Sequence, residues 1–188
     1  MSRLTRRSTA DMTDAQRELF ERMAEGRSNV VDGHIGGPFD AWLLSPATGQ
    51  RLFQLGGALR HKPCIDRRHI ELAILVTGQV WQAQYEWYAH EPMARAAGLP
   101  ENVIQAVKAG EVPTFNDPGD EAAYHFSVTL HRDHRVDDAT YRRTADIFGE
   151  DGVQELINAC GMYTLVSMTL NTFEVDLPEG ATPPFAGN

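Results

Sequence analysis

The chain has 188 residues, of which 42% are hydrophobic and 23% charged, and its formal net charge is −9 at pH 7. This length and composition predict a single globular domain over residues 1–188 and exclude a disordered, collagen-like or membrane-embedded protein. The acidic balance also argues against nucleic acid or an anionic membrane as the main partner.

Capping residues and apolar spacing predict helices from the start of the chain. A capping box opens a helix over residues 13–25. Residues 27–45 are interrupted by glycine and proline, which predicts a loop that leads into one or two helical turns. A Ser-Pro pair then begins a helix over residues 46–61.

The next segment, residues 66–80, is apolar on nearly every side, as a buried helix is. A strand is the alternative for so apolar a run, but its length and lack of alternation favour a helix. Pro92, inside the following helix, indicates a kink or a later start. Spacing and caps predict further helices over residues 82–97, 100–109, 117–130, 137–149 and 153–173. The predicted fold class is therefore all-α, a single-domain helical bundle with loose termini at residues 1–10 and 178–188.

Glu86 and His90 are four residues apart and therefore share one helix face. A solvated surface pair is the alternative interpretation. Glu71 favours a site, because its apolar neighbours leave its carboxylate little solvent and it needs a partner. A carboxylate beside an imidazole fixes its tautomer and raises its basicity, as general acid or base catalysis requires. We expect these three catalytic candidates to form one hydrogen-bonded group at the wall of a mostly apolar pocket.

Aromatic and polar residues are the candidates for the lining of that pocket. Tyr85 and Trp87 lie beside the Glu/His pair in sequence. Phe39 and Trp42 follow the glycine-rich loop, which lacks the GK[ST] ending of a phosphate loop and is better interpreted as a pocket rim. Asn171, polar within the apolar last helix, faces either the site or an interface.

No metal or organic cofactor is predicted. His125, His131 and His134 are close in sequence, and the last two are spaced so that both could bind one ion. Their charged neighbours are more typical of a solvated helix end. The Glu/His group offers an alternative ligand set, but the HExxH pattern is absent. Cys64 and Cys160 form no CxxC, so neither a disulfide framework nor a zinc site is predicted.

The chain is expected to be cytoplasmic. Its apolar runs are shorter than the roughly 20 residues of a membrane span, and no apolar segment follows the basic start MSRLTRRSTADM, so a signal peptide is not predicted. The helices at residues 70–80 and 153–173 are apolar on most sides, more than a domain of this size hides, which predicts a homo-oligomer.

Three segments, RRHIELAIL, QYEWYAHEPMARAAGLPENVIQAV and TLVSMTLNTFEVDLPEG, resemble the carboxymuconolactone decarboxylase family, and the resemblance covers about residues 36–177. It implies an all-helical fold of the alkylhydroperoxidase D-like type. It also implies homo-oligomers, trimers or hexamers, with sites at or near subunit contacts. In this pattern His90 matches the family histidine and Glu71 the upstream glutamate.

The resemblance also bears on the reaction. Peroxidase members carry a CxxC ahead of the histidine, whereas Ala83 and Glu86 stand at the matching positions here, so the disulfide-relay reaction lacks its nucleophile. The decarboxylase branch implies loss of CO₂ from a small carboxylated lactone or related organic acid. The ring carbonyl is then the electron sink, the histidine handles the proton, and no cofactor is needed.

Fold membership alone does not fix the substrate, and the chain looks more like longer relatives with a YEW-type signature than like the decarboxylase itself. A non-catalytic protein of the same fold, which binds a small ligand or acts as a scaffold, is the alternative. A hydroperoxide reductase is a less favoured alternative.

Overall fold

The computed structural model describes residues 2–5, 7–28 and 30–186. Over these residues the structure contains eight α-helices, one 3-10 turn at Thr9–Asp11, and no strand beyond an isolated bridge between Val31 and His34. The prediction of an all-α fold is confirmed. The helices are α1 (Asp14–Ala24), α2 (Phe39–Trp42), α3 (Pro46–His61), α4 (Arg67–Val80), α5 (Gln84–Ala96), α6 (Glu101–Ala109), α7 (Pro118–Asp133) and α8 (Asp138–Thr172).

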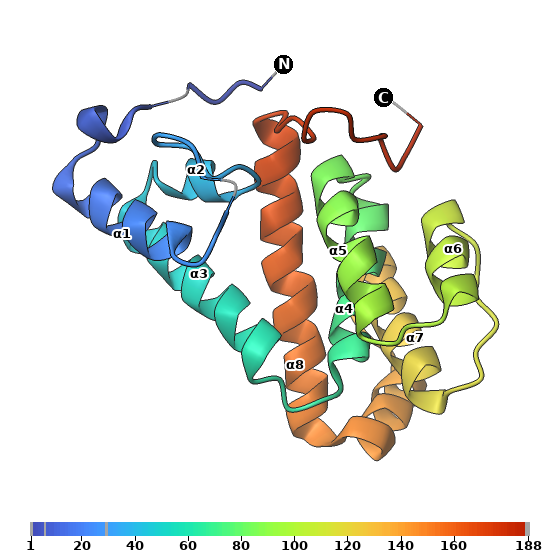
Figure 1. The fold of residues 1–188 in the computed structure, drawn as a ribbon. Helices are drawn as coiled ribbons and strands as arrows, with labels where there is room; N and C mark the ends of the chain where they lie inside the picture. Colours follow the sequence, from blue (N-terminus) through green and yellow to red (C-terminus); the bar gives the residue numbers. More distant parts are fainter. Residues whose placement is uncertain (1, 6, 29, 187–188) are drawn as a thin grey trace.

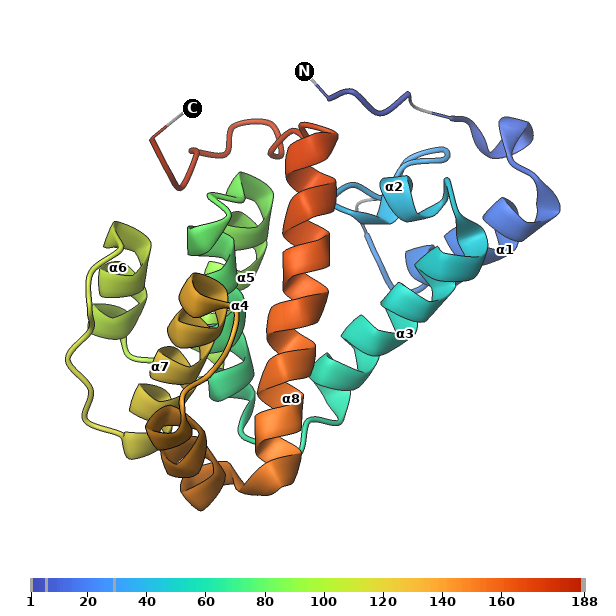
Figure 2. The same cartoon turned by 180° about the vertical axis from the view of Figure 1, so that it is seen from behind.

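The long helix α8 runs through the middle of the molecule (Figure 1). Helices α1, α2 and α3 lie on one side of it and α4, α5, α6 and α7 on the other, as the view from behind also shows (Figure 2). Helix α4 packs against α5, α7 and α8. It also contacts α6, and because these helices surround it, every residue of α4 from 69 to 78 is buried.

Side-chain caps explain why the helices begin where they do. Thr13 and Gln16 form the predicted capping box, with the Thr13 N–H donating to Gln16 Oε1 at 3.0 Å. Asp66, Asp117 and Asp137 each accept a hydrogen bond from a backbone N–H in the first turn of the helix that follows. The predicted helix starts agree with these caps to within two residues.

One helix starts later than its predicted span, and one predicted break lies inside a continuous helix. Helix α5 begins at Gln84 rather than at residue 82, because Gln82 has a φ of +48° and cannot continue a right-handed helix. The predicted break near residue 149 is present inside α8, where Gly149 has a φ of +71° and divides the helix into two rods.

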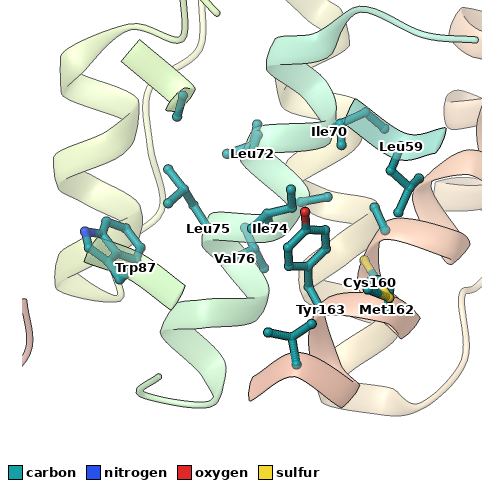
Figure 3. Packing of buried hydrophobic residues seen from close by; sticks show 14 of the residues in the cluster. Leu59, Ile70, Leu72, Ile74, Leu75, Val76, Trp87, Cys160, Met162 and Tyr163 are labelled. Carbon is teal, nitrogen blue, oxygen red and sulfur yellow. The ribbon is translucent and has the colours of Figure 1, made fainter. Parts of the chain in front are cut away.

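The hydrophobic core draws residues from most helices, and its part around α4, α5 and the second rod of α8 is shown in Figure 3. From α4, Ile70, Leu72, Ile74 and Leu75 are fully buried. They contribute to the same core as Trp87 of α5 and the buried residues of α8. Each such side chain stabilises the fold by about 1.5 to 3 kcal/mol, so the α4–α5 and α4–α8 contacts hold the site residues of α4 and α5 in fixed positions.

Both described ends of the chain contact the helical body, while the looseness of residues 1–10 and 178–188 stays a prediction. The Arg3 N–H donates to Phe173 O at 2.8 Å, at the end of α8. Phe185 is buried against Trp87, with ring centroids 5.3 Å apart, and exchanges two hydrogen bonds with Gln84. Residues 1, 6 and 187–188 of the predicted termini lie outside the described residues.

None of the described helices combines the length and the apolarity needed to cross a membrane.

Candidate functional site

Helices α4 and α5 bring Glu71, Glu86 and His90 together. Glu71 Oε2 lies 2.7 Å from His90 Nδ1, and Glu86 Oε1 lies 3.2 Å from His90 Nε2. The Glu71 contact is a hydrogen bond. The Glu86 contact has the distance of an ion pair but not the geometry of a hydrogen bond, since Glu86 Oε1 has no hydrogen-bond partner among the described residues. The imidazole is therefore held between two carboxyl groups.

Arg67 completes the surroundings of Glu71. It lies one helical turn before Glu71 on α4, and both its Nε, at 2.8 Å, and its Nη2 donate to Glu71 Oε1. The Glu71 side chain has no solvent exposure. Arg67 was not among the predicted site residues, although its i,i+4 spacing to Glu71 is the signal that could have found it.

The pKa values of the two carboxyl groups are shifted in opposite directions. Burial raises the pKa of Glu86 to about 7, and the nearby Glu71 charge adds to this, while His90 and Arg60 act against it. Burial also acts on Glu71, but the hydrogen bond and charge of His90, together with Arg67, outweigh it and lower the pKa of Glu71.

His90 itself is stabilised in its protonated form. Burial opposes the imidazolium, but the Glu86 charge and the hydrogen bond and charge of Glu71 together raise the pKa of His90. Because the Glu86 carboxyl and the His90 imidazole lie 3.2 Å apart and each shifts the pKa of the other, they take up and release protons as one unit. Such a unit can donate or accept a proton at physiological pH.

The Glu86 and His90 side chains line a cavity of about 140 Å³ between α5, α3 and α8. Its wall is mostly apolar, with two arginines and two tyrosines as the further polar groups. Tyr163 of α8 contacts His90 edge to face, with ring centroids 4.9 Å apart. The remaining lining residues are Arg27, Pro38, Phe39, Trp42, Phe53, Gly56, Arg60, Tyr85, Ala89, Met93, Met162 and Val166.

The structure places three of the five predicted pocket residues at this cavity. Phe39, Trp42 and Tyr85 line it. Trp87 does not, because it is fully buried on another side of α5 and its Nε1 donates to a glutamate one turn later, at residue 91. Asn171 does not either, since it is exposed and its Nδ2 donates to the carbonyl of residue 81 at 2.7 Å. Both predictions are corrected by these contacts.

A second, larger cavity of about 620 Å³ lies beside the first. It is bordered by the loop at residues 33–37, the segment at residues 175–179 and the N-terminal residues. Tyr85 borders both cavities, and its ring lies against Gly37, where a Cβ would come within 2.9 Å of it. The larger cavity contains none of the three interacting site residues, so we place the chemistry in the smaller one.

The histidines of α7 do not converge. His131 Nε2 lies 2.9 Å from Thr77 Oγ1, His125 packs against aromatic rings, and His134 ends the helix in a left-handed conformation with a φ of +57°. The sequence allowed a metal site at these three histidines but favoured a solvated helix end instead, and it predicted no other role for them.

One other cluster has the residue types of a metal site. Within the described part of the chain, His69, Asp117 and Asp120 are the set whose ligand atoms lie within 4.8 Å of one another. Arg68 already supplies positive charge to both carboxylates, with Nη2 2.8 Å from Asp117 and Nε 3.1 Å from Asp120. We therefore interpret the cluster as an ion-pair network that joins α4 to the start of α7.

Comparisons with known proteins agree with this architecture. The chain has the fold of the alkylhydroperoxidase D core. It is similar to a solved structure described as an alkylhydroperoxidase AhpD core, an uncharacterized peroxidase-related protein from Ralstonia eutropha JMP134, with a TM-score of 0.75 at 16% identity, over 95% of this chain and 93% of that one. At this identity the likeness shows the fold alone.

Residues 46–127, which hold Glu71, Glu86 and His90, match the profile of the carboxymuconolactone decarboxylase family. The resemblance found in the sequence is therefore confirmed over this part of the chain. No curated protein matches the chain significantly.

The raised pKa of Glu86 predicts a pH-dependent stability. The unfolded chain releases this proton near pH 4.5 and the folded chain near pH 7, so the folded state loses stability as the pH rises between these values. Glu86→Gln removes this titration, and its free energy of unfolding should rise relative to wild type over that interval, by at most about 3 kcal/mol. Urea unfolding at a series of pH values measures the difference.

The matched control is Glu21→Gln, which changes an exposed glutamate on α1. It should follow the wild-type pH dependence. If the difference in the free energy of unfolding between Glu86→Gln and wild type stays constant over the same pH interval, Glu86 does not have a raised pKa in the folded protein.

Proposed function

We propose that the protein is a cofactor-independent enzyme in which His90 transfers a proton on a small carboxylated lactone or related organic acid. One observation carries the proposal: an imidazole lies between two buried carboxyl groups at the wall of a small, mostly apolar cavity. Groups that titrate near neutral pH and face a cavity are typical of acid–base catalysis. The match to the carboxymuconolactone decarboxylase family supports the substrate class.

Glu71 and Arg67 act as positioning residues in this proposal. His90 and Arg67 together keep Glu71 ionised, and the Glu71 carboxylate accepts the hydrogen bond from His90 Nδ1–H at 2.7 Å. This contact fixes the ring orientation and leaves Nε2 as the nitrogen that exchanges protons. Glu86, 3.2 Å from Nε2, interacts with it as an ion pair, so the two groups titrate together.

In a decarboxylation, the bond between the ring carbon and the departing carboxylate breaks, CO₂ leaves, and the electron pair moves into the conjugated lactone carbonyl. The resulting enolate then takes a proton on carbon from the His90–Glu86 unit, which regains a proton from water. Substrate carboxylate and one proton thus give the decarboxylated lactone and CO₂. The step needs one donor with a pKa near neutrality, as the pKa of Glu86 near 7 provides.

A ligand-binding protein of the same fold is the alternative. It would use the same cavity without proton transfer. Replacing the imidazole while keeping its size and polarity therefore distinguishes the two functions.

We expect His90→Gln to lower the turnover of a carboxylated lactone about 100- to 10,000-fold, because proton transfer is lost. The substrate is first found by screening the purified protein against small carboxylated lactones and related acids. The wild-type rate should follow a bell-shaped pH profile that reports the His90–Glu86 unit. Steady-state kinetics over a range of pH measures both effects.

His61→Gln is the matched control, since His61 is exposed at the end of α3. It should leave turnover unchanged. Unchanged turnover in His90→Gln, or acids that bind without any turnover, would support the ligand-binding alternative instead.

Thiol-dependent peroxide reduction should be absent. Attack on a peroxide needs a thiolate, but burial raises the pKa of Cys160 to about 11, and burial, Glu155 and Asp151 raise that of Cys64. Neither cysteine lines the His90 cavity. Peroxide consumption with a dithiol donor tests this expectation. Activity that disappears in Cys64→Ser or Cys160→Ser would show that a relocated thiol carries peroxidase chemistry.

We also propose that the protein forms a homo-oligomer through α8. Ile157, Leu165 and Met168 are 38% to 46% exposed on one face of this helix, and Gly161 between them has open space above it. Such an apolar stripe is typical of a helix that packs against a second copy. Light scattering at micromolar concentration should give the mass of an oligomer, and Leu165→Asp should shift it toward the monomer. A wild-type monomer would contradict the proposal.

A further inference from the structure

Two arginines from distant parts of the sequence line the same cavity as Glu86 and His90. Arg27 follows α1, and Arg60 lies near the end of α3. Each Nε donates to the carbonyl four residues earlier, Arg27 to Met23 at 2.7 Å and Arg60 to Gly56 at 3.3 Å. The Arg27 guanidinium also lies over the Phe39 ring, 4.2 Å from its centroid. Both guanidinium groups are therefore held at the cavity and do not extend freely into solvent.

Neither arginine forms an ion pair with a carboxylate among the described residues. This distinguishes them from Arg67, which pairs with Glu71, and from Arg68, which pairs with Asp117 and Asp120. Their proximity is unfavourable in the absence of an anion: burial and the charge of Arg60 lower the pKa of Arg27. In a chain of net charge −9, two half-buried cations that form no ion pair among the described residues are unusual.

The charges around the cavity confirm this imbalance. Arg67 offsets Glu71, and Glu86 and His90 share a proton, so these four groups are compensated. Arg27 and Arg60 are then left with no carboxylate of the described residues at ion-pair distance, although the charge of Arg60 acts on the pKa of Glu86. Trp42 also lines the cavity, and its Nε1–H is buried without an acceptor among the described residues. A ligand with a negatively charged oxygen would satisfy both guanidinium groups.

The geometry points to a carboxylate-binding subsite: Arg27 and Arg60 hold a carboxylate of the substrate at the mouth of the cavity, so that the rest of the molecule faces His90 and Glu86. The inference rests on the proposed function and assigns recognition of the substrate to Arg27 and Arg60. A volume of about 140 Å³ suits a small acid. The apolar wall, including Phe53 and Met162, favours a carboxylate over a phosphate dianion, whose desolvation costs more.

The experiment compares γ-butyrolactone carboxylate with its uncharged carboxamide, by calorimetry on the full chain. Wild type should bind the carboxylate about 10- to 100-fold more tightly, as expected for hydrogen bonds between charged groups. Arg27→Gln and Arg60→Gln should each remove about tenfold of this preference. Arg60→Lys, which keeps the charge but loses the planar fork, should retain part of it.

Arg51→Gln is the matched control, since Arg51 is exposed on the same helix as Arg60 and does not line the cavity. It should bind like wild type. Circular dichroism checks that each variant is folded, and if Arg27→Gln is not, Arg60→Gln and the wild-type ligand pair still decide the result. The subsite is overturned if wild type binds the carboxylate and the carboxamide equally or does not bind the carboxylate. It is also overturned if wild type binds inorganic phosphate more tightly, or if both Gln variants keep the full preference for the carboxylate.

His90→Gln separates this inference from the proposed function. It should keep the preference for the carboxylate, because the arginines are intact. Loss of the preference in His90→Gln would assign recognition to the imidazole and overturn the role of Arg27 and Arg60. Retained preference together with unchanged turnover would contradict the proposed function and leave the subsite supported.

Discussion

The burial of the Glu71 carboxylate is the constraint on which the site depends. Glu71 lies in α4, where every residue from 69 to 78 is buried, and its side chain has no exposed area. An unpaired charge there would cost several kcal/mol. Arg67 from the same helix and His90 from α5 provide the compensation. Since His90 must reach Glu71, the contact fixes how α5 lies against α4, and the packing of the core then keeps the imidazole in place.

The same imidazole gives the two glutamates different roles. Glu71 has a hydrogen bond from each partner and stays ionised, whereas Glu86 has only the ion-pair contact with His90 and is driven toward its neutral form by burial. Pairs of carboxyl groups whose environments move their pKa values apart are typical of acid–base sites. Glu71 therefore orients the imidazole ring, and Glu86 is the carboxyl group that burial shifts toward its protonated form beside the cavity.

Local patterns in the sequence predicted the helices and the Glu/His group, because caps such as Asp66 and i,i+4 spacings act over a few residues. Other features depend on the tertiary fold. Trp87 follows Glu86 directly, but successive residues point about 100° apart on a helix, so Trp87 faces the core. Arg27 and Arg60 come from segments on the other side of α8, and nothing local distinguishes them from surface arginines until the fold brings them to the cavity.

The arginines also constrain which part of a substrate they can hold. In a decarboxylation, the leaving carboxylate loses its negative charge as the bond breaks, and charge develops on the lactone carbonyl instead. Cations that bind the leaving group would stabilise the ground state more than the transition state and slow the reaction. Arg27 and Arg60 are therefore compatible with catalysis only if their carboxylate is one that the substrate retains. The departing group then lies against the apolar wall near Met162 and Val166, where loss of charge is favoured.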